Sequence, residues 1–458
     1  MTLYLQRKTI NKLILFFLGL SLALSSLFCE ANEWYKDYNL KKITKYSQQY
    51  KTTITFFQSE KLSSKPSITL IHGVGGSAQD FKKIIDLLSS HYQLTLPDLP
   101  NFGQSNNSVN VYSPKDYANI LIEVLPSLVS KENIIIGHSM GGNISLQIAL
   151  TKPLLAKKLV LIDAAGFLNK FSYSKHIASN YVSDKFSFAE NYLPKLKSTI
   201  DKINQYIPDP SSLLLSKKGR EHLLKNNNNY IAALAVINED LTSIIRKKAP
   251  PTLILWGEKD GVMPVQVAAM LSYLLNTQNV HIFNKAGHSP QKQFPKQVAN
   301  KILNFIQDIN NPSERSINKV NENIIVNCHK EDNIHLLTNA QYLSVTIKNC
   351  QNQEISNLTA TTLSVFNSNI VFTHLALKAT DSYAMTLMNS NIEIWGGELR
   401  GLSIAYIERS ELELNGVDLY SQYALVISNI PITINASLTN AHLNKTLKTW
   451  HGLIDVGF

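Results

Sequence analysis

The amino-acid sequence predicts an α/β domain followed by an all-β domain. From residue 51 to about residue 312, short β-branched runs alternate with amphipathic segments, an order that indicates a mainly parallel sheet covered by helices. After Pro312 the helical periodicity disappears, and short alternating segments recur about every 20 to 22 residues. A chain of 458 residues is also too long for one compact core. We therefore expect two domains, at residues 32–312 and 313–458.

Residues 1–31 have the pattern of a signal peptide. Three basic residues within the first twelve positions precede a 16-residue apolar run, Leu13 to Phe28. A run this short is more typical of a signal than of a membrane span. The leader predicts export to the periplasm, the cell surface or the medium, with Asn32 as the first mature residue. An uncleaved leader would instead anchor the chain in a membrane.

Seven segments of the first domain are candidate strands. Each is a short run rich in β-branched or aromatic residues, and amphipathic segments such as Phe81–Leu88 and Tyr117–Leu128 lie between them. Open sheets of this kind bind ligands beyond the carboxyl ends of their strands. The candidate strands are Ile54–Phe57, Ile68–Ile71, Gln93–Leu96, Ile134–Ile136, Leu159–Ile162, Leu253–Trp256 and Val280–Phe283.

A sharp turn is predicted between the strand Ile134–Ile136 and the helical pattern that follows it. Ser139 lies at this turn in the motif Gly137-His-Ser-Met-Gly141, where glycine avoids collisions around a strained backbone. Such a turn lifts the serine hydroxyl clear of the sheet. A glycine-rich turn without a nucleophile is the alternative for the motif alone, but the flanking strand and helix favour a nucleophile.

A glycine-rich loop, His72-Gly-Val-Gly-Gly-Ser77, follows the strand Ile68–Ile71. A phosphate loop is the rival interpretation, but the Gly-Lys-Ser/Thr signature is missing. Near a serine nucleophile the loop fits an oxyanion hole better. In that interpretation the N–H groups of Val74 and Met140 stabilise the negative oxygen of a tetrahedral intermediate.

Asp260 and His288 are the predicted partners of Ser139. They follow two consecutive strands, so both are expected at the same edge of the sheet. The order Ser139, Asp260, His288 is the order expected for a nucleophile-elbow triad. Asp163, which follows the preceding strand, is a competing acid, and Glu258 is a weaker one.

Together these motifs resemble the α/β-hydrolase family, most closely secreted bacterial lipases and esterases. The resemblance covers about residues 51–310 and is more specific for the fold than for the substrate. It implies an α/β-hydrolase sheet with a helical cap at residues 165–249. Asn101 stands where relatives commonly have glycine, at a position outside the chemistry. The matching motifs are His72-Gly-Val-Gly-Gly, Leu96-Pro-Asp-Leu-Pro-Asn-Phe-Gly-Gln-Ser105, Gly137-His-Ser-Met-Gly-Gly, Leu161-Ile-Asp-Ala-Ala-Gly166, Trp256-Gly-Glu-Lys-Asp260 and Ala286-Gly-His288.

The insertion at residues 165–249 is rich in aromatic residues at its start. Phe186 and Phe188 are candidates for the lining of an apolar acyl pocket, and His138, beside the nucleophile, is a third candidate substrate-binding residue. The alternative is that the aromatic side chains pack in an ordinary helical core.

The second domain contains four similar segments: Asn367-Ser-Asn-Ile-Val-Phe372, Asn389-Ser-Asn-Ile-Glu-Ile394, Arg409-Ser-Glu-Leu-Glu-Leu414 and Asn429-Ile-Pro-Ile-Thr-Ile434. Their fixed spacing predicts a β-solenoid in which each coil stacks on the previous one. A β-sandwich of about seven strands is the alternative.

Cys328 and Cys350 are 22 residues apart, which is about one coil of the predicted solenoid. Strands one coil apart lie about 4.8 Å from each other, within the Cα separation that a disulfide spans. We therefore expect a disulfide between adjacent coils. A metal site formed with His329 and His335 is the weaker interpretation.

The net charge of +10 is spread along the chain and forms no long basic cluster with aromatic residues. Nucleic acid is therefore not an expected partner. The short basic run Arg246-Lys247-Lys248 is interpreted as a solvated helix end.

These features predict an exported serine hydrolase that cleaves carboxylic esters, a lipase or esterase, without a metal or an organic cofactor. The expected partner is an ester or lipid substrate, and a membrane or glycan surface is a further expected contact of the C-terminal domain. Two alternatives stay open. One is another α/β-hydrolase chemistry, such as carbon-carbon bond hydrolysis or acyl transfer, and the other is a surface adhesin with a glycan-binding solenoid.

Overall fold

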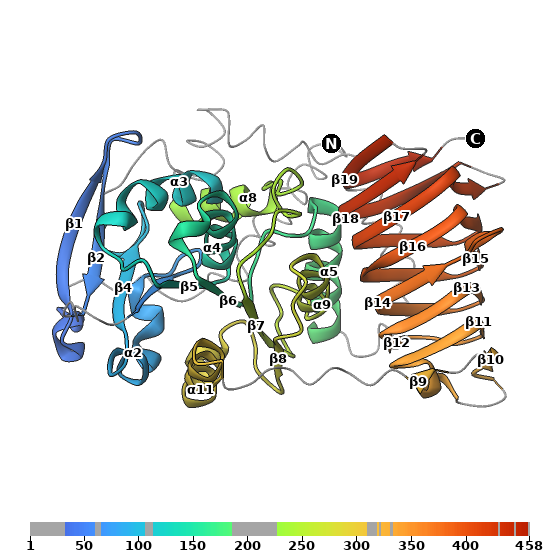
Figure 1. The fold of residues 1–458 in the computed structure, drawn as a ribbon, viewed down its shortest axis with the longest axis horizontal. Helices are drawn as coiled ribbons and strands as arrows, with labels where there is room; N and C mark the ends of the chain where they lie inside the picture. The colour runs from blue at the N-terminus through green and yellow to red at the C-terminus, as the bar shows by residue number, and fades with distance from the viewer. Residues whose placement is uncertain are drawn as a thin grey trace, which may run out of the picture.

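The computed structural model shows an α/β unit beside a tall stack of strands (Figure 1). The predicted signal peptide lies outside the described residues, and the predicted domain boundaries fall at undescribed positions. Among the described residues, no helix combines the length and apolar character that a membrane crossing requires. The structure describes residues 33–59, 66–105, 113–185, 227–308, 318–319, 322–329, 333–428, 431–443 and 446–456.

The α/β unit contains an eight-stranded sheet in the order β1-β2-β4-β3-β5-β6-β7-β8. The two antiparallel pairs are β1 with β2 and β2 with β4, and the remaining neighbours are parallel. All seven candidate strands are present. The bounds are β1 (Lys41–Ser47), β2 (Thr52–Gln58), β3 (Ser67–Ile71), β4 (Gln93–Asp98), β5 (Asn133–His138), β6 (Lys158–Ile162), β7 (Thr252–Gly257) and β8 (Val280–Phe283).

Strand β1 was not predicted from the sequence. It is an edge strand that contains three lysines and is largely exposed, so it lacks the apolar run that marks a buried strand. Lysines on an edge strand also oppose pairing with other chains. Strand β1 therefore extends the sheet without adding much to its core.

Helices cover both faces of the sheet, and two separate apolar cores result. Phe56 belongs to the core beneath α3, α4 and α9, whereas its neighbour Phe57 belongs to the core beneath α2 and α11, as the alternation of side chains along a strand requires. The α-helices are α2 (Lys82–Ser89), α3 (Pro114–Val124), α4 (Met140–Thr151), α5 (Lys170–Lys185), α8 (Asn228–Ile237), α9 (Gln266–Leu274), α10 (Pro290–Gln293) and α11 (Pro295–Ile306). The 3₁₀ turns are η1 (Trp34–Tyr38), η2 (Ala78–Phe81), η3 (Leu125–Ser127), η4 (Pro153–Leu155) and η7 (Ile334–Leu337).

The C-terminal part is a solenoid of stacked, mainly parallel strands, which excludes the β-sandwich alternative (Figure 1). Leu377, Leu399 and Leu419 are paired in register on successive strands. Among the described strands of the solenoid, only β19 runs antiparallel to its neighbour. The strands are β9 (Asn318–Lys319), β10 (Asn323–Asn327), β11 (Ala340–Lys348), β12 (Gln353–Ser356), β13 (Leu358–Phe366), β14 (Asn369–Lys378), β15 (Tyr383–Met388), β16 (Asn391–Glu408), β17 (Glu411–Ser428), β18 (Ile432–Leu443) and β19 (Thr446–Val456).

The repeated Asn-Ser-Asn motif forms one corner of the solenoid. Asn367 and Asn389 have φ angles of 49° and 47°, a left-handed conformation that asparagine tolerates better than most residues. The Asn389 side chain donates to the Asn367 side chain at 3.3 Å. Ser390 Oγ accepts a hydrogen bond from the Ser368 amide at 3.1 Å. The repeat thus supplies both the turn and the contact between coils.

The strand pairing of the last repeat is offset from its sequence motif. The sequence motif aligned Leu414 with Ile434, whereas the structure pairs Leu414 with Ala436. The pairing of β17 with β18 also skips from Asn415 to Asp418 before it resumes. Because side chains alternate across a strand, a slip of two residues keeps the apolar face inward and leaves little trace in the sequence.

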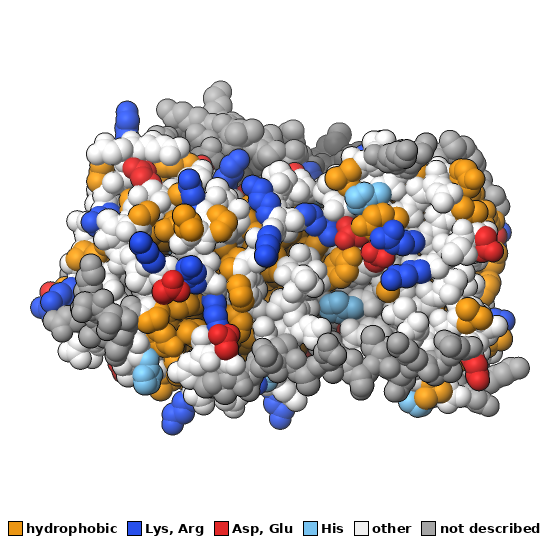
Figure 2. Space-filling view, viewed as in Figure 1, with side chains coloured by type: hydrophobic (Ala, Val, Ile, Leu, Met, Phe, Trp, Pro, Cys, Tyr) orange, Lys and Arg blue, Asp and Glu red, His pale blue; other side chains and the backbone are white. Residues whose placement is uncertain are grey.

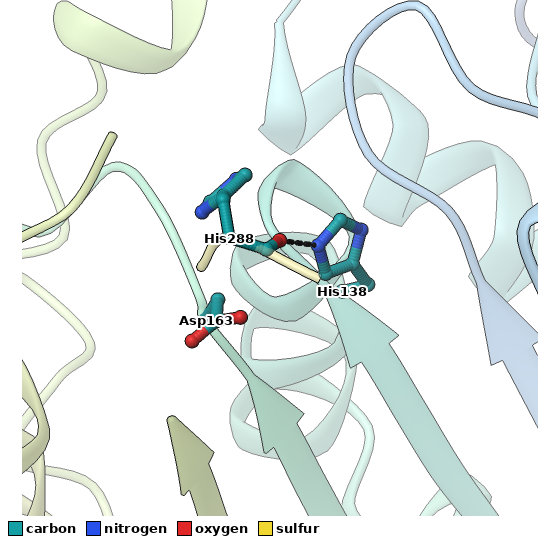
Figure 3. A group of neighbouring side chains, drawn as sticks. All are labelled: His138, Asp163 and His288. Carbon is teal, nitrogen blue, oxygen red and sulfur yellow. Dashed lines mark hydrogen bonds between the residues drawn. The ribbon is translucent and has the colours of Figure 1, made fainter. Parts of the chain in front are cut away.

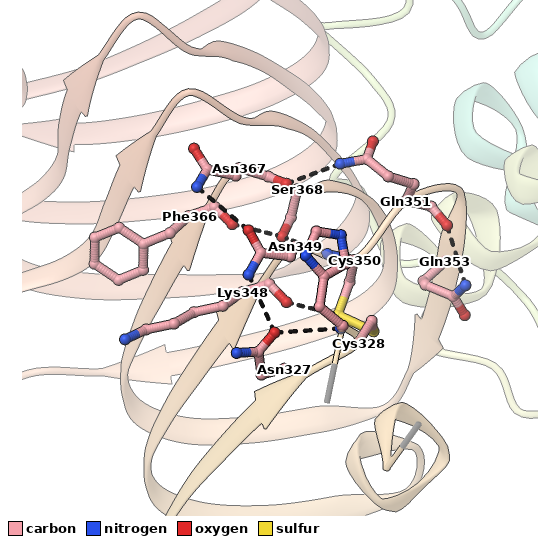
Figure 4. Close-up of a disulfide and its surroundings, with 11 residues drawn as sticks. Asn327, Cys328, Lys348, Asn349, Cys350, Gln351, Gln353, Phe366, Asn367 and Ser368 are labelled. Carbon is pink, nitrogen blue, oxygen red and sulfur yellow. Dashed lines mark hydrogen bonds between the residues drawn. A yellow bond between two sulfur atoms is a disulfide. The ribbon is translucent and has the colours of Figure 1, made fainter. Parts of the chain in front are cut away.

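Cys328 and Cys350 form a disulfide with a Cα–Cα distance of 5.1 Å (Figure 4). The Cys328 amide donates to the Lys348 carbonyl oxygen at 3.1 Å, so the two segments are also joined through their backbones. Cys350 is fully buried in the solenoid core. The disulfide therefore links the first coil to the second, as the 22-residue spacing predicts.

Cys328→Ser is expected to lower the free energy of unfolding of the solenoid by about 3 kcal/mol, because the cross-link restricts the unfolded chain. Thermal unfolding of the full chain, with and without reductant, measures this effect. Reductant should lower the melting temperature of the unsubstituted protein and leave that of the variant unchanged. Equal melting temperatures for both proteins under oxidising conditions would show that the link contributes nothing.

Candidate active site

Ser139 lies at the turn between strand β5 and helix α4. Its backbone angles are φ 55° and ψ −123°, an unusual conformation for a residue with a side chain. A Cβ on Gly141 would collide with the carbonyl oxygen of Ile71, which explains the glycine two positions after the serine. The Ser139 amide donates to the carbonyl oxygen of Ile162 at 3.0 Å. The strained turn is therefore supported by the neighbouring strands.

Ser139, His288 and Asp260 form a continuous chain of hydrogen bonds. His288 Nε2 lies 3.0 Å from Ser139 Oγ, and His288 Nδ1 lies 2.8 Å from Asp260 Oδ2. The Asp260 side chain is fully buried, whereas 22% of the His288 side chain is exposed. Strands β5, β7 and β8 thus bring together three residues that are far apart in the sequence.

The partners of Asp260 determine how His288 is protonated. Asp260 Oδ1 accepts hydrogen bonds from the amides of Val262 and Met263 at 2.8 and 3.1 Å. An ionised carboxylate can only accept, so the proton of a neutral His288 ring is on Nδ1. Nε2 then has a free lone pair that can accept the Ser139 hydroxyl proton. This is the protonation state that a general base requires.

Asp163, the competing acid, is also close to His288 (Figure 3). One of its carboxylate oxygens lies within 4.8 Å of a His288 ring nitrogen. Asp163 Oδ1 accepts the Gly257 amide at 2.7 Å, while the buried Oδ2 has no partner among the described residues. Burial, together with the negative charge of Asp260, raises the pKa of Asp163 well above its ordinary value. The structure therefore hydrogen-bonds His288 to Asp260 and favours a protonated Asp163.

His138 contacts the backbone of His288. Its Nε2 lies 2.6 Å from the His288 carbonyl oxygen, as Figure 3 shows. Burial and the neighbouring His288 lower the pKa of His138 to about 3, so the ring is neutral and Nε2–H is the donor. The described contact holds the loop that carries His288. The predicted contact of His138 with substrate stays a prediction.

The side chains of His138, Asp163 and His288 are close enough together to be considered as ligands of a metal ion. Three of the four ring nitrogens already have partners: His138 Nε2 faces the His288 carbonyl oxygen, and His288 Nδ1 and Nε2 face Asp260 and Ser139. The observed arrangement suits proton transfer, and we assign no metal to it.

The loop predicted to form an oxyanion hole runs against Ser139. A Cβ on Gly73 would lie 2.8 Å from Ser139 Cβ, and a hydrogen bond from the Gly76 amide to the Gly73 carbonyl closes a turn around Val74. Met140 is the first residue of α4, where amides have no partner within the helix. Both predicted N–H groups thus belong to segments beside Ser139, and their role stays a prediction.

Not every predicted residue can be placed, and some residues of this region were missed. Phe186 and Phe188 lie outside the described residues. His72, which the sequence analysis treated only as part of the loop motif, is fully buried. Its Nδ1 contacts the Gly73 carbonyl oxygen at 2.8 Å, and its Nε2 accepts the Leu99 amide at 3.0 Å. His72 therefore fixes the start of the loop that contains Val74.

Comparison with known proteins agrees with the fold of the α/β unit. Residues 66–199 match the family model for the alpha/beta hydrolase fold. The α/β unit therefore has the α/β-hydrolase fold, and the chain is similar to hydrolases of this fold. It is similar to an uncharacterized hydrolase of Bacillus subtilis, with 27% identity over 260 residues, 55% of this chain and 94% of the relative.

Two other similar proteins are named as a lipase and an esterase. Lipase 3 of Moraxella sp. is 27% identical over 261 residues, which are 55% of this chain and 80% of the lipase. The solved structure of an esterase from Thermogutta terrifontis is 20% identical, with a TM-score of 0.41 over 59% of this chain and 99% of the esterase.

Proposed function

We propose that the protein is an exported serine hydrolase that cleaves carboxylic esters, with lipid esters as the substrate class. The observation that carries the proposal is the chain of hydrogen bonds from Ser139 Oγ through His288 to Asp260. Similarity to a lipase supports the choice of esters. The basic and apolar leader of the sequence supports export.

In the proposed reaction His288 Nε2 takes the proton from Ser139 as Oγ attacks the ester carbonyl carbon. The negative charge that develops on the carbonyl oxygen is stabilised by the amides of Val74 and Met140. Asp260 stabilises the imidazolium that forms. His288 then gives its proton to the leaving alcohol, which departs and leaves an acyl group on Ser139.

Water completes the proposed cycle by the same route. His288 removes a proton from the water molecule, the resulting hydroxide attacks the acyl carbon, and the proton returns to Ser139 as the carboxylic acid leaves. His138 keeps the His288 loop in place through the bond to its carbonyl oxygen. The cycle uses only side chains and backbone groups of this chain.

The proposal is tested with purified full-length protein and a chain-length series of nitrophenyl esters. We expect ester hydrolysis, and we expect a fluorophosphonate probe to label Ser139, as located by peptide mapping. Prior labelling should abolish hydrolysis, because the probe occupies the oxygen that attacks the ester. Hydrolysis by a protein fully labelled at Ser139 would contradict the mechanism, and absence of both labelling and hydrolysis would contradict the proposed function.

A further inference from the structure

The solenoid shares its core with the α/β unit. Helices α5 and α9 lie between the sheet and the stack of strands (Figure 1). Trp395 of β16 and Leu438 of β18 are buried in the same apolar core as Ile144 of α4 and Met263 of the loop after β7. The space-filling view shows the two parts in contact across this junction, with acidic and basic side chains close together there (Figure 2). The solenoid and the α/β unit therefore share one apolar core.

The surface of the solenoid is shaped to receive helix α9. At Gly396 a Cβ would lie 2.8 Å from Tyr273 Cβ, and at Gly416 it would collide with Met270. Two glycines at equivalent positions of adjacent coils thus let α9 approach the backbone closely. Helix α9 begins six residues after Asp260, so this contact fixes the element that directly follows the acid loop.

The chain that leaves strand β6 is also bound to the solenoid. Asn169 immediately precedes α5, and its amide donates to Ser437 Oγ at 3.1 Å. The Asn169 side chain donates to the Ala436 carbonyl oxygen at 2.7 Å and to Asn435 Oδ1 at 2.8 Å. Asn169 lies six residues after Asp163 and four after Ala165, whose amide donates to the Ser139 carbonyl oxygen. A short chain segment therefore connects the nucleophile to the solenoid.

Lys175 of α5 forms ion pairs with two neighbouring carboxylates of the solenoid. Glu393 and Glu413 are register partners on adjacent strands, where two like charges repel. Lys175 Nζ contacts Glu413 Oε2 at 2.8 Å and also bonds Glu393. Burial alone would lower the pKa of Lys175, but the two carboxylates raise it above its ordinary value. The positive charge of Lys175 thus offsets the repulsion between the two stacked glutamates.

The other end of the insertion between β6 and β7 is held in the same way. Arg246 Nη1 contacts Asp418 Oδ2 at 2.7 Å, and Arg246 Nη2 donates to the Leu438 carbonyl oxygen at 3.2 Å. Tyr273 of α9 donates its hydroxyl to the same Asp418 oxygen at 2.8 Å. The interpretation of Arg246 as part of a solvated helix end was therefore wrong, because the solenoid supplies an acid that no local pattern reveals.

Two further side chains of α5, Tyr173 and His176, are influenced by the charge of Asp260. Tyr173 packs against the core that contains the nucleophile helix α4. Burial, with the charge of Asp260, raises the pKa of Tyr173 to about 12, and burial lowers the pKa of His176 to about 4 against the charge of Asp260. Both side chains thus lie within the electrostatic reach of the acid. Helix α5 thus contacts the solenoid through Lys175 and packs through Tyr173 against the core that contains α4.

We propose that the solenoid holds both ends of the insertion between β6 and β7 in place, like a clamp. Lys175 and Arg246 are the positioning residues of this clamp. By fixing the insertion, the clamp determines which esters reach Ser139. This inference rests on the proposed function, because it concerns the selectivity of the same site. Rigid placement of α5 keeps Tyr173 and His176 at one distance from the nucleophile. A displacement of about 1 Å in a residue that contacts the substrate can cost roughly 10²-fold in the rate of its reaction.

The test uses the full chain and compares Lys175→Met with Lys175→Arg. Methionine keeps most of the side-chain volume and removes the charge, whereas arginine keeps the charge. Lys158→Met is a matched control, because Lys158 pairs with Asp308 at 2.6 Å and donates to the Phe305 carbonyl oxygen, away from the solenoid. The measurements are kcat and KM for nitrophenyl acetate and octanoate, the rate of fluorophosphonate labelling of Ser139, and hydrogen exchange of α5.

In Lys175→Met we expect the ratio of kcat/KM for octanoate to that for acetate to fall by about tenfold or more. The change should appear mainly in KM, with labelling of Ser139 by a small probe unchanged within about twofold. Amides at the start of α5 should exchange faster. Lys175→Arg should restore the ratio, and Lys158→Met should leave both the ratio and α5 exchange as in the unsubstituted protein.

Unaltered exchange of α5 in Lys175→Met would overturn the clamp, whatever the enzyme hydrolyses. Faster exchange with an unchanged ester ratio would overturn its effect on selectivity. Equal losses in Lys175→Met and Lys158→Met would reduce the effect to general destabilisation and also overturn it. If the unsubstituted protein neither hydrolyses esters nor reacts with the probe, the proposed function is contradicted. The hydrogen exchange of α5 then still shows whether the solenoid holds the insertion in place.

Discussion

Ser139→Ala is expected to lower kcat for ester hydrolysis by about 10⁴-fold or more. The substitution removes the oxygen that lies 3.0 Å from His288 Nε2, and with it the nucleophile of the proposed reaction. KM should change little, because the methyl group of alanine leaves the remainder of the site in place. His288→Ala should cause a similar loss, since the hydroxyl then has no base.

The double variant Ser139→Ala/His288→Ala tests whether the two residues act together as one catalytic unit or contribute to the rate independently. Residues that act together are not additive, so the double variant should be about as slow as either single variant. Ser145→Ala is a matched control on the same helix, where Ser145 Oγ donates to the Gly141 carbonyl oxygen at 2.6 Å. Near-normal activity in Ser139→Ala, or a comparable loss in Ser145→Ala, would exclude Ser139 as the nucleophile.

The catalytic region could be predicted because its positions follow from topology. Ser139, Asp260 and His288 each follow a strand with an evident apolar run, and parallel strands end at one edge of a sheet. The same reasoning placed Asp163 close to His288, and the order of the motifs along the chain ranked Asp260 above it without showing which carboxyl group meets the ring. Their ranking depends on which oxygen meets His288 Nδ1, and that distance is set by loop geometry rather than by residue type.

The contacts between the two parts could not be predicted, since nothing near Lys175 in the sequence indicates its partners. Glu413 is 238 residues away, and its alternating segment reads like that of any other coil. Trp395 and Gly396 likewise look like irregularities of a repeat until α9 is placed against them. The solenoid period was predictable from the regular spacing of its apolar side chains. The residues of its outer face could not be interpreted in the same way, because they contact helices of another domain.

The neighbouring carboxyl groups of Asp163 and Asp260 have different environments. Asp260 accepts two backbone amides and contacts His288, so its negative charge is well compensated. Asp163 accepts one amide, and the charge of Asp260 adds to burial in raising its pKa. Two nearby carboxyl groups do not both ionise readily, and the better compensated group keeps the charge. Asp260, which contacts His288 Nδ1 directly, is therefore the acid of the proposed triad.

Asp260→Asn is expected to lower kcat by about 10³- to 10⁴-fold, because the amide no longer holds the proton on His288 Nδ1. Asp163→Asn should lose less than about tenfold, since asparagine keeps an oxygen for the Gly257 amide. In Asp260→Asn, loss of the Asp260 charge removes one cause of the raised pKa of Asp163, so part of the remaining activity should depend on Asp163 and increase with pH. The double variant should lose that part and its pH dependence. Measuring the kinetics of the three variants across pH shows which carboxyl group is the acid of the triad. An inactive Asp163→Asn variant together with an active Asp260→Asn variant would assign that role to Asp163.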